Sequence, residues 1–246
     1  MSAPEPLQRM IDRLRTRAHL QPDDCDAIRA LPTRRRSYEP PAYLVREGRS
    51  PIQYCSFLIS GFAIRQKLAA NGARQIVSIH VPGDYIDLQN LFLKRADHNV
   101  QALTRLETID IERQALQDLV LRHPPIGRAL WIDALVDASI YREWVLNVGR
   151  RDARQRIAHL LCEFTVRMEA VGLAERGTMY ELPMTQEQLG DATGLTSVHV
   201  NRTLKALEGD GLISRNKRFI TIADWDRMRA VADFSALYLH LDQTHA

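Results

Sequence analysis

The spacing of apolar residues divides the chain into regions of different character. Between residues 6 and 30, apolar side chains recur at the helical period in two short blocks. From 38 to 111, apolar and polar residues alternate, as in strands whose side chains point to opposite faces of a sheet. After residue 113 the helical period returns. The pattern predicts an α+β protein with a β-rich N-terminal domain.

The alternating region predicts a jelly-roll barrel or sandwich, because many short strands at regular spacing are typical of these architectures. Asn71-Gly72 is a strong signal for a two-residue type I′ hairpin, a turn in which both central residues need positive φ. Such a barrel can enclose a small ligand or have a filled core, and both readings stay open. The predicted strands are 43–46, 53–59, 63–68, 75–80, 100–102 and 107–111.

A long helix is predicted from about 126 to 147, after a short helix at 113–122 that Pro124-Pro125 ends. Its apolar residues are alternately three and four positions apart, which is the spacing of a coiled-coil seam. We interpret this seam as a homodimer interface. The alternative is a helix lying on its own barrel, and a second apolar face permits both arrangements. The seam comprises Trp131, Ala134, Ala138, Tyr141, Val145 and Val148.

Residues 184–221 predict a helix-turn-helix followed by a two-stranded wing. Thr185 can cap the first helix together with Gln188, three residues further on, and Thr196 can cap the second. Gly194 supplies the turn, where a left-handed backbone is cheap only for glycine. The basic residues at the tip of the following hairpin complete the pattern of a winged DNA-binding domain.

The outer face of the second helix carries residues suited to reading base edges in a major groove. Arg202 can pair with guanine, Asn201 can pair with adenine, and Val198 offers only an apolar contact, for instance to a thymine methyl. Ser197 and Lys205 extend the same face. Other polar residues would contact phosphates, which fix position without reading sequence. These phosphate candidates are Thr185, Gln186, Thr196, His199, Arg215, Lys217 and Arg218.

The domain organisation follows from the change of pattern at Gly149-Arg150-Arg151, which we interpret as a hinge. We expect a barrel domain with N-terminal helices at 1–125, a dimerisation helix and hinge at 126–149, and a winged helix-turn-helix domain at 150–246. The triplet Arg34-Arg35-Arg36 is either a nucleic-acid contact or, as is more common for such clusters, part of a solvated strand or loop.

Composition narrows the class of protein. The 246 residues are 45% hydrophobic and 26% charged with a net charge of +3, as in ordinary globular proteins with a mild preference for anionic partners. No apolar run approaches the roughly 20 residues of a membrane span, and the N-terminus lacks a signal-peptide core, so we expect a cytoplasmic protein. No nucleophile elbow, phosphate-binding loop or metal-ligand cluster is present, so we expect no enzymatic activity.

Three segments carry a resemblance to the Crp/Fnr family of bacterial transcription regulators: VPGDYIDLQNLF, GRRDARQRIAHLL and TQEQLGDATGLTSVHVNRTLKALEGDGLIS. The resemblance covers nearly the whole chain. It implies a cyclic-nucleotide-binding-like barrel, a homodimer, and inverted-repeat sites on double-stranded DNA. It also implies contact with RNA polymerase and relay of an effector's state through the long helix. The alternatives are a winged module that binds protein instead of DNA, and a regulator that responds to a cyclic nucleotide.

The sequence also departs from the family pattern. Cyclic-AMP-binding members carry a glutamate for the ribose hydroxyl and an arginine followed by serine or threonine for the phosphate, where this chain has Leu88, His98 and Asn99. These three positions are our candidates for an effector pocket, and they argue against a cyclic nucleotide. In the recognition helix Arg202 matches the family's arginine, whereas Val198 stands where glutamate is common, so the half-site should keep one guanine and differ elsewhere.

The cysteines and histidines limit which cofactors the chain could hold. Cys25, Cys55 and Cys162 are scattered and cannot repeat the four-cysteine iron–sulfur cluster of oxygen-sensing members. They are interpreted as buried or indifferent thiols, although a redox-sensing role stays open. Haem also stays open, because His80 and His98 could serve as axial ligands, but each is more commonly an ordinary barrel histidine. No metal site is predicted.

Overall fold

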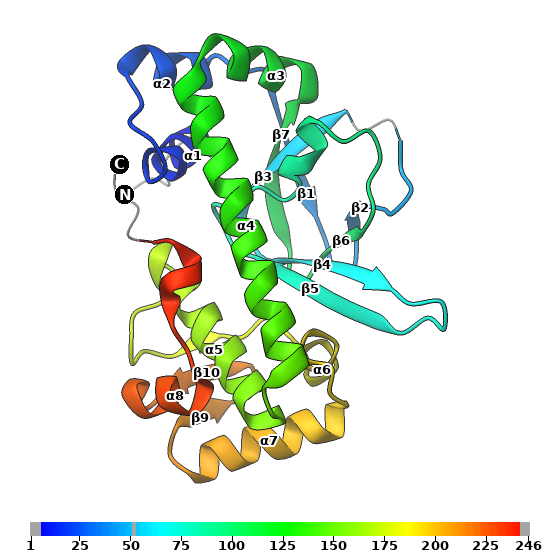
Figure 1. Ribbon diagram of the computed structural model, residues 1–246, viewed down its shortest axis with the longest axis vertical. Helices are drawn as coiled ribbons and strands as arrows, with labels where there is room; N and C mark the ends of the chain where they lie inside the picture. The colour runs from blue at the N-terminus through cyan, green and yellow to red at the C-terminus, as the bar shows by residue number, and fades with distance from the viewer. Residues whose placement is uncertain (1–5, 51–52, 242–246) are drawn as a thin grey trace. The chain divides into compact units, whose positions relative to one another are not determined.

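The computed structural model describes residues 6–50 and 53–241, which form two compact units (Figure 1). The first unit contains the described residues up to 65, residues 79–138 and the described end of the chain from His240. The second contains residues 66–78 and 139–239. The long helix α4 (Pro124–Arg150) contributes its first part to one unit and its last part to the other.

The first unit is built on antiparallel strands with helices around them; of the strands given below, β4 and β5 have their residues 66–78 in the second unit. One sheet has the order β1-β7-β3 and the other β2-β6-β4-β5. The strands are β1 (Thr33–Tyr38), β2 (Tyr43–Val45), β3 (Tyr54–Ser60), β4 (Ala63–Leu68), β5 (Arg74–His80), β6 (Asn99–Ala102) and β7 (Leu106–Glu112). The helical elements are α1 (Pro6–Arg15), α2 (Pro22–Arg29), the 3-10 turn η1 (Leu88–Leu91) and α3 (Arg113–Arg122), followed by α4.

The largest core cluster of this unit lies where the helices pack on β3 and β7. Met10 and Leu14 of α1 meet Phe57 and Ile109 of the sheet, and Ile126 joins them from the start of α4. All five are at least 96% buried. A smaller cluster around Leu58, Ile86, Val100 and Leu106 fills the space between strands. The alternation seen in the sequence thus separates these two apolar layers.

Three details of the strands and of α4 differ from the sequence-based prediction. Strand β1 is absent from the predicted strands, because its polar residues alternate with no apolar partner; it pairs with β7 in an exposed edge position. The β4–β5 connection is not a two-residue type I′ turn. Only Gly72 has positive φ, and Asn71 Oδ1 instead accepts a hydrogen bond from Ala73 N at 3.0 Å. Finally, α4 begins at Pro124, since proline fits the first helical turn, where no N–H bond is required.

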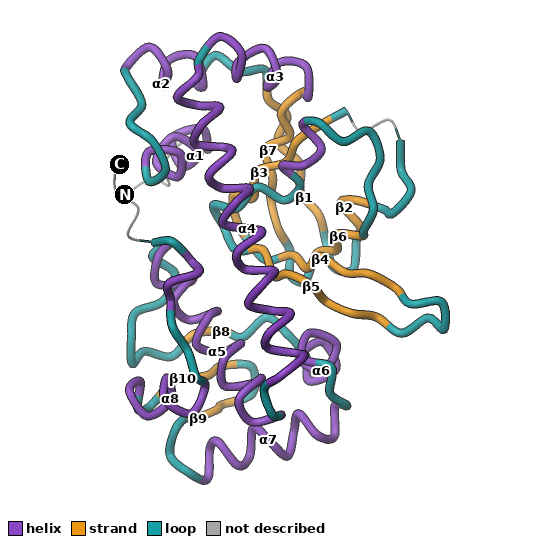
Figure 2. The backbone as a smooth tube through the Cα atoms, viewed as in Figure 1, coloured by secondary structure: helices purple, strands orange, loops and turns teal. Residues whose placement is uncertain are grey.

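The second unit holds the helix-turn-helix and the wing (Figure 2). Its helical elements are α5 (Ala153–Ala170), α6 (Gln186–Thr193), α7 (Ser197–Gly209), α8 (Trp225–Ala232) and η2 (Ala236–Leu239). The strands β8 (Tyr180–Glu181), β9 (Ile213–Asn216) and β10 (Phe219–Ile222) form a sheet of order β8-β10-β9. Residues 66–78 of the β4–β5 hairpin belong to this unit, in which Arg74 Nη2 lies 2.6 Å from Asp191 Oδ2 of α6.

Helix ends in this unit follow the local signals in the sequence. Asp152 caps α5 by accepting from Gln155 N at 2.9 Å, and Asp224 caps α8 by accepting from Arg227 N at 3.1 Å. The sequence predicts one last helix that Asp224 opens, with an apolar face of Trp225, Met228, Val231, Ala232, Leu237 and Leu241. Helix α8 ends at Ala232 instead, because Asp233 adopts a left-handed conformation. Leu237 and Leu241, whose helical spacing predicts packing on the body, are 81% and 39% exposed.

Candidate functional site

The helix-turn-helix is assembled by caps that use short polar side chains. Thr185 Oγ1 accepts from Gln188 N at 3.2 Å, while Gln188 Oε1 accepts from Thr185 N at 2.8 Å, forming the predicted capping box. Thr196 Oγ1 accepts from His199 N at 3.3 Å at the start of α7. Gly194 ends α6 with φ of 68°. The start of the recognition helix is therefore defined by groups within the motif itself.

Two residues that the sequence-based prediction missed fix how α6 meets its neighbours. A Cβ on Gly190 would lie 2.4 Å from Leu195 O, so only glycine allows the chain after α6 to cross it this closely. Arg156 of α5 donates from Nη1 to Thr193 O at 3.0 Å and from Nε to Arg151 O at 2.8 Å. A cation suits this place because helix C-termini present unpaired carbonyl groups. The only sequence signal for Gly190 was a glycine inside a helical pattern.

The five candidate base-reading residues lie on one face of α7. Val200, Leu204 and Leu207 are buried and hold the opposite face against the domain. Val198 is 78% exposed, Asn201 is half-buried, and Ser197, Arg202 and Lys205 are exposed. Among the described residues, the Arg202 side chain forms no ion pair or hydrogen bond, so its guanidinium is available to a ligand. This face can present two amide or guanidinium donors and one apolar contact to a groove.

The candidate phosphate contacts divide into two groups. Thr185, Gln186, Thr196 and His199 lie at the N-terminal ends of α6 and α7, where backbone N–H groups favour anions. The two threonine hydroxyls accept the capping hydrogen bonds, so their O–H groups can still donate to a phosphate, as can the side chain of Gln186. Gln186 is exposed, and His199 is half-buried.

The other three candidate phosphate contacts are basic residues of the wing, and they differ in their surroundings. Arg215 is held by Glu208 of α7, with Nη2 2.9 Å from Oε2 and its backbone N 3.2 Å from Oε1. These hydrogen bonds lower the pKa of the Glu208 carboxyl. Lys217 occupies the turn with φ of 58°, and Arg218 lies 3.7 Å from Glu181. Arg215 therefore joins the wing to the recognition helix, and Lys217 and Arg218 are the more exposed charges.

A second exposed surface runs along α4. Of the predicted seam, Trp131 is 60% exposed, Val145 is 69% exposed and Ala134 is exposed, whereas Ala138, Tyr141 and Val148 are half-buried. Leu135, which lies outside the predicted seam, is 61% exposed and belongs to this surface. Phe92 also joins it, because its ring stacks on Trp131 with centroids 6.4 Å apart. This contact joins segments far apart in sequence, so no local pattern predicted it.

The three candidate effector residues are buried and already engaged. Leu88 belongs to the main core cluster. His98 lies between two carboxylates, with Nε2 3.0 Å from Asp87 Oδ1 and Nδ1 2.6 Å from Asp97 Oδ1. Asn99 Oδ1 accepts from Glu47 N at 3.0 Å. None of the three lines the barrel cavity described next.

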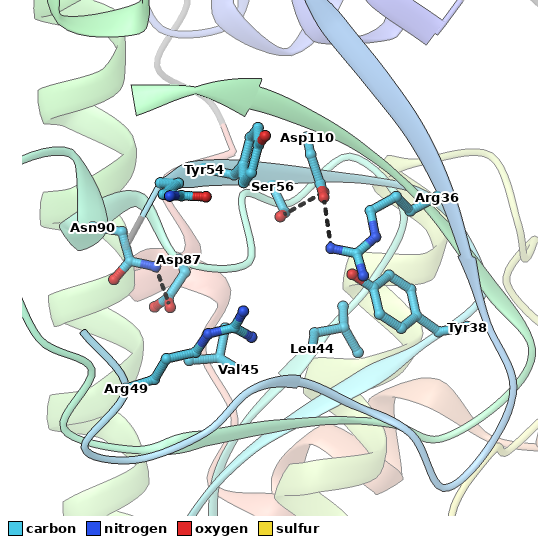
Figure 3. Close-up of a pocket in the computed structure, with 11 residues that line it drawn as sticks. Arg36, Tyr38, Leu44, Val45, Arg49, Tyr54, Ser56, Asp87, Asn90 and Asp110 are labelled. Carbon is cyan, nitrogen blue, oxygen red and sulfur yellow. Dashed lines mark hydrogen bonds and ion pairs between the residues drawn. The ribbon is translucent and has the colours of Figure 1, made fainter. Parts of the chain in front are cut away.

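A cavity of about 100 Å³ does open in the barrel, on other residues (Figure 3). Asp110 forms one wall, accepting from Ser56 Oγ at 2.8 Å and lying 3.4 Å from Arg36 Nη1. On the other side Asn90 donates to Asp87 Oδ2 at 2.5 Å. The cavity is lined by Arg36, Tyr38, Leu44, Val45, Arg49, Gln53, Tyr54, Ser56, Asp87, Asn90 and Asp110. Arg36 of the basic triplet therefore lies on the exposed strand β1, and its guanidinium pairs with the buried carboxylate of Asp110.

The remaining candidate groups are buried. His80 and His98 are 2% and 4% exposed, and no cluster of three or more metal-binding side chains occurs in residues 6–50 and 53–241. The three cysteines are buried and unpaired. Burial raises the pKa of Cys55 and of Cys162 to about 12, which keeps both thiols protonated near neutral pH. Within the described chain, no helix is long and apolar enough to cross a membrane.

Comparison with known proteins identifies two matching domain models and several similar proteins. Residues 35–123 match the model of the cyclic nucleotide-binding domain, and residues 155–231 match that of the Crp-like helix-turn-helix domain. The chain is 30% identical over 196 residues, 78% of each protein, to the transcriptional activator protein FnrL of Cereibacter sphaeroides. It is 27% identical over 173 residues to the nitrogen fixation regulation protein FixK of Azorhizobium caulinodans, covering 70% of this chain and 68% of FixK.

A solved structure, that of FixK2 from Bradyrhizobium japonicum, superposes with a TM-score of 0.76 at 26% identity. The match covers 84% of this chain and 100% of the FixK2 chain. FnrL is by name a transcriptional activator and FixK a regulation protein. The two matched domains follow one another in this chain, with the cyclic nucleotide-binding domain first and the helix-turn-helix second.

Proposed function

Because the chain belongs to the Crp/Fnr family of DNA-binding transcription regulators, we propose that it acts as a homodimer on an inverted-repeat site. The observation that carries the proposal is the outer face of α7, on which exposed Arg202 and Val198 lie opposite a fully buried apolar face. Such a helix enters a major groove with its N-terminal half, where side chains reach base edges. Because the proposed target is DNA, the protein would act in the cytoplasm.

In this proposal each residue group has a separate task. Arg202 pairs with a guanine, Asn201 with an adenine, and Val198 packs on a thymine methyl, while Ser197 and Lys205 border them. The helix N-termini and the wing residues Lys217 and Arg218 contact phosphates, which set the register. Arg215 acts mainly through Glu208, since its guanidinium is already engaged there.

Dimerisation supplies the symmetry of the site. We infer that the α4 surface around Trp131, Leu135 and Val145 pairs with the same surface of a second copy, as in isologous interfaces. The two recognition helices would then enter successive major grooves about 34 Å apart. An effector or modification acting on the barrel would shift the population between dimer geometries, and RNA polymerase would be the partner on the promoter.

In vitro selection from a random duplex pool with the purified, ligand-free protein tests this function. We expect enrichment of an inverted repeat with half-site centres one helical turn apart. Binding should weaken steeply with salt, with log K falling by roughly 0.9 per phosphate contact for each decade of salt. A winged module that binds protein through an apolar surface would enrich no sequence and show little salt dependence.

Cyclic AMP is expected to leave DNA affinity unchanged. Leu88 cannot accept a hydrogen bond from the ribose hydroxyl, and an incoming phosphate would meet the Asp87 and Asp97 carboxylates that flank His98. Fluorescence anisotropy with a labelled inverted repeat, with and without the nucleotide, measures this directly. A tenfold gain in affinity, about 1.4 kcal/mol, would contradict our interpretation of the barrel.

A further inference from the structure

The residues after α8 contact the rest of the domain through side chains that are not part of the proposed DNA-binding surface. Residues 233–239 lie beyond the matched helix-turn-helix region, which ends at 231. Asp233, with φ of 48°, turns the chain so that the following segment runs beside α5 (Figure 1, red). Phe234 is 6% exposed and Leu239 is 2% exposed. This segment is therefore packed on the domain rather than trailing from it.

A buried carboxylate on α5 joins this segment to α4. Glu163 is 2% exposed, and its carboxylate accepts from Trp144 Nε1 of α4 at 3.1 and 3.0 Å. Tyr238 of the segment donates to Glu163 Oε2 at 2.8 Å, and Arg167 Nη1 lies 3.6 Å from Oε1. A buried carboxylate needs such partners, because burying an unpaired charge is costly. One side chain thus requires donors from α4 and from the C-terminal segment together.

Two more contacts connect the same three elements. Arg151, between α4 and α5, reaches Glu143 Oε1 of α4 at 2.7 Å and Asp233 O at 3.1 Å. His159 of α5 is 1% exposed and packs against the rings of Phe234 and Tyr238, with centroids 5.2 and 5.8 Å away. Burial, and then the charge of Arg151, lower the pKa of His159 to about 3, so the ring is neutral and packs as an aromatic group.

We propose that residues 233–239 clamp α5 to the last part of α4 (residues 139–150), and that this clamp sets the half-site spacing that the dimer recognises. The inference rests on the proposed function, because spacing has meaning only for a dimeric DNA-binding protein. The recognition helix is tied to α5 through Arg156 and the α6 end, so the angle between α5 and α4 determines where α7 points. Glu163 and Tyr238 are positioning residues, remote from any base.

The variant Tyr238→Phe tests the clamp, because it removes one hydroxyl and keeps the ring that packs on His159. Tyr180→Phe is the matched control: its hydroxyl lies 2.7 Å from Thr165 Oγ1 on the same α5 helix, outside the clamp contacts. Trp144→Phe removes the donor on the α4 side and should act like Tyr238→Phe. Hydrogen exchange of backbone amides 151–157 and selection from duplexes with varied half-site spacing are the two measurements.

We expect the native protein and Tyr180→Phe to prefer one spacing. Tyr238→Phe and Trp144→Phe should accept neighbouring spacings almost equally and exchange the 151–157 amides roughly 10-fold faster, while affinity for a single half-site stays unchanged. One preferred spacing with unchanged exchange in Tyr238→Phe would overturn the clamp. So would equal changes in Tyr180→Phe, because these would reflect general destabilisation.

The two proposals fail in different ways. If the native protein selects no inverted repeat, the proposed function fails, and with it the link between clamp and spacing. Hydrogen exchange then still decides whether the segment holds α5 on α4, because that measurement needs no DNA. If the native protein selects a repeat and the clamp variants keep its single spacing and its exchange rates, the proposed function stands and the clamp alone is rejected.

Discussion

Replacing Trp131 with glutamate is expected to yield monomers and to lower affinity for the inverted repeat by about 100-fold or more. The Trp131 side chain is 60% exposed in the single chain, and its burial in a symmetric seam would contribute about 2–4 kcal/mol per protomer. In Trp131→Glu the apolar burial of the ring is lost in both copies, and two like charges lie near the symmetry axis. A monomer engages one half-site at a time and loses the gain from tethering two binding events.

Light scattering and DNA-binding titration measure the two consequences. Tyr141→Glu should act in the same direction. Leu121→Glu is the matched control, because Leu121 of α3 is 80% exposed and lies outside the seam, so the same charge there should leave the dimer intact. A dimer mass that persists in Trp131→Glu would reject the seam.

The helix-turn-helix could be read from the sequence because local groups define it. Thr185, Gln188 and Thr196 cap helices with their own neighbours, and Gly194 needs only its own backbone freedom. The helical spacing of α4 and the alternation of the barrel are equally local, so both elements were predicted within a few residues. The fold class follows from these signals in order along the chain.

What the sequence did not reveal depends on contacts between distant segments. Three such contacts have no local sequence pattern. They are the close approach of Leu195 O to Gly190, the two hydrogen bonds that Arg156 donates to backbone carbonyls, and the stacking of Phe92 on Trp131. Strand β1 was anticipated only as a solvated strand or loop at Arg34-Arg35-Arg36, since it exists through pairing with β7 and has no apolar face of its own. The barrel cavity is likewise lined by the neighbouring Asp87 and Asn90 and not by Leu88, the candidate that the family resemblance gave, because the Leu88 side chain packs into the core.

Removing the Arg202 guanidinium by Arg202→Ala is expected to cost about 1–3 kcal/mol on the selected site, a loss of roughly 5- to 150-fold, and to relax preference at one base pair. The residue is exposed on α7 and has no partner among the described residues, so its removal leaves no buried group unpaired. The loss should therefore appear in specific binding and leave the fold and the dimer unchanged.

Arg218→Ala provides the contrast that identifies the kind of contact. Arg218 is an exposed wing residue, and loss of a phosphate contact should weaken specific and non-specific DNA alike while reducing the salt slope by about 1. Titrations of both variants on the selected site, on the site with its guanine replaced, and on unrelated duplex separate the two behaviours. If Arg202→Ala loses affinity equally on all three duplexes, Arg202 contacts phosphate, and the base-reading role must move to Asn201 and its neighbours on α7.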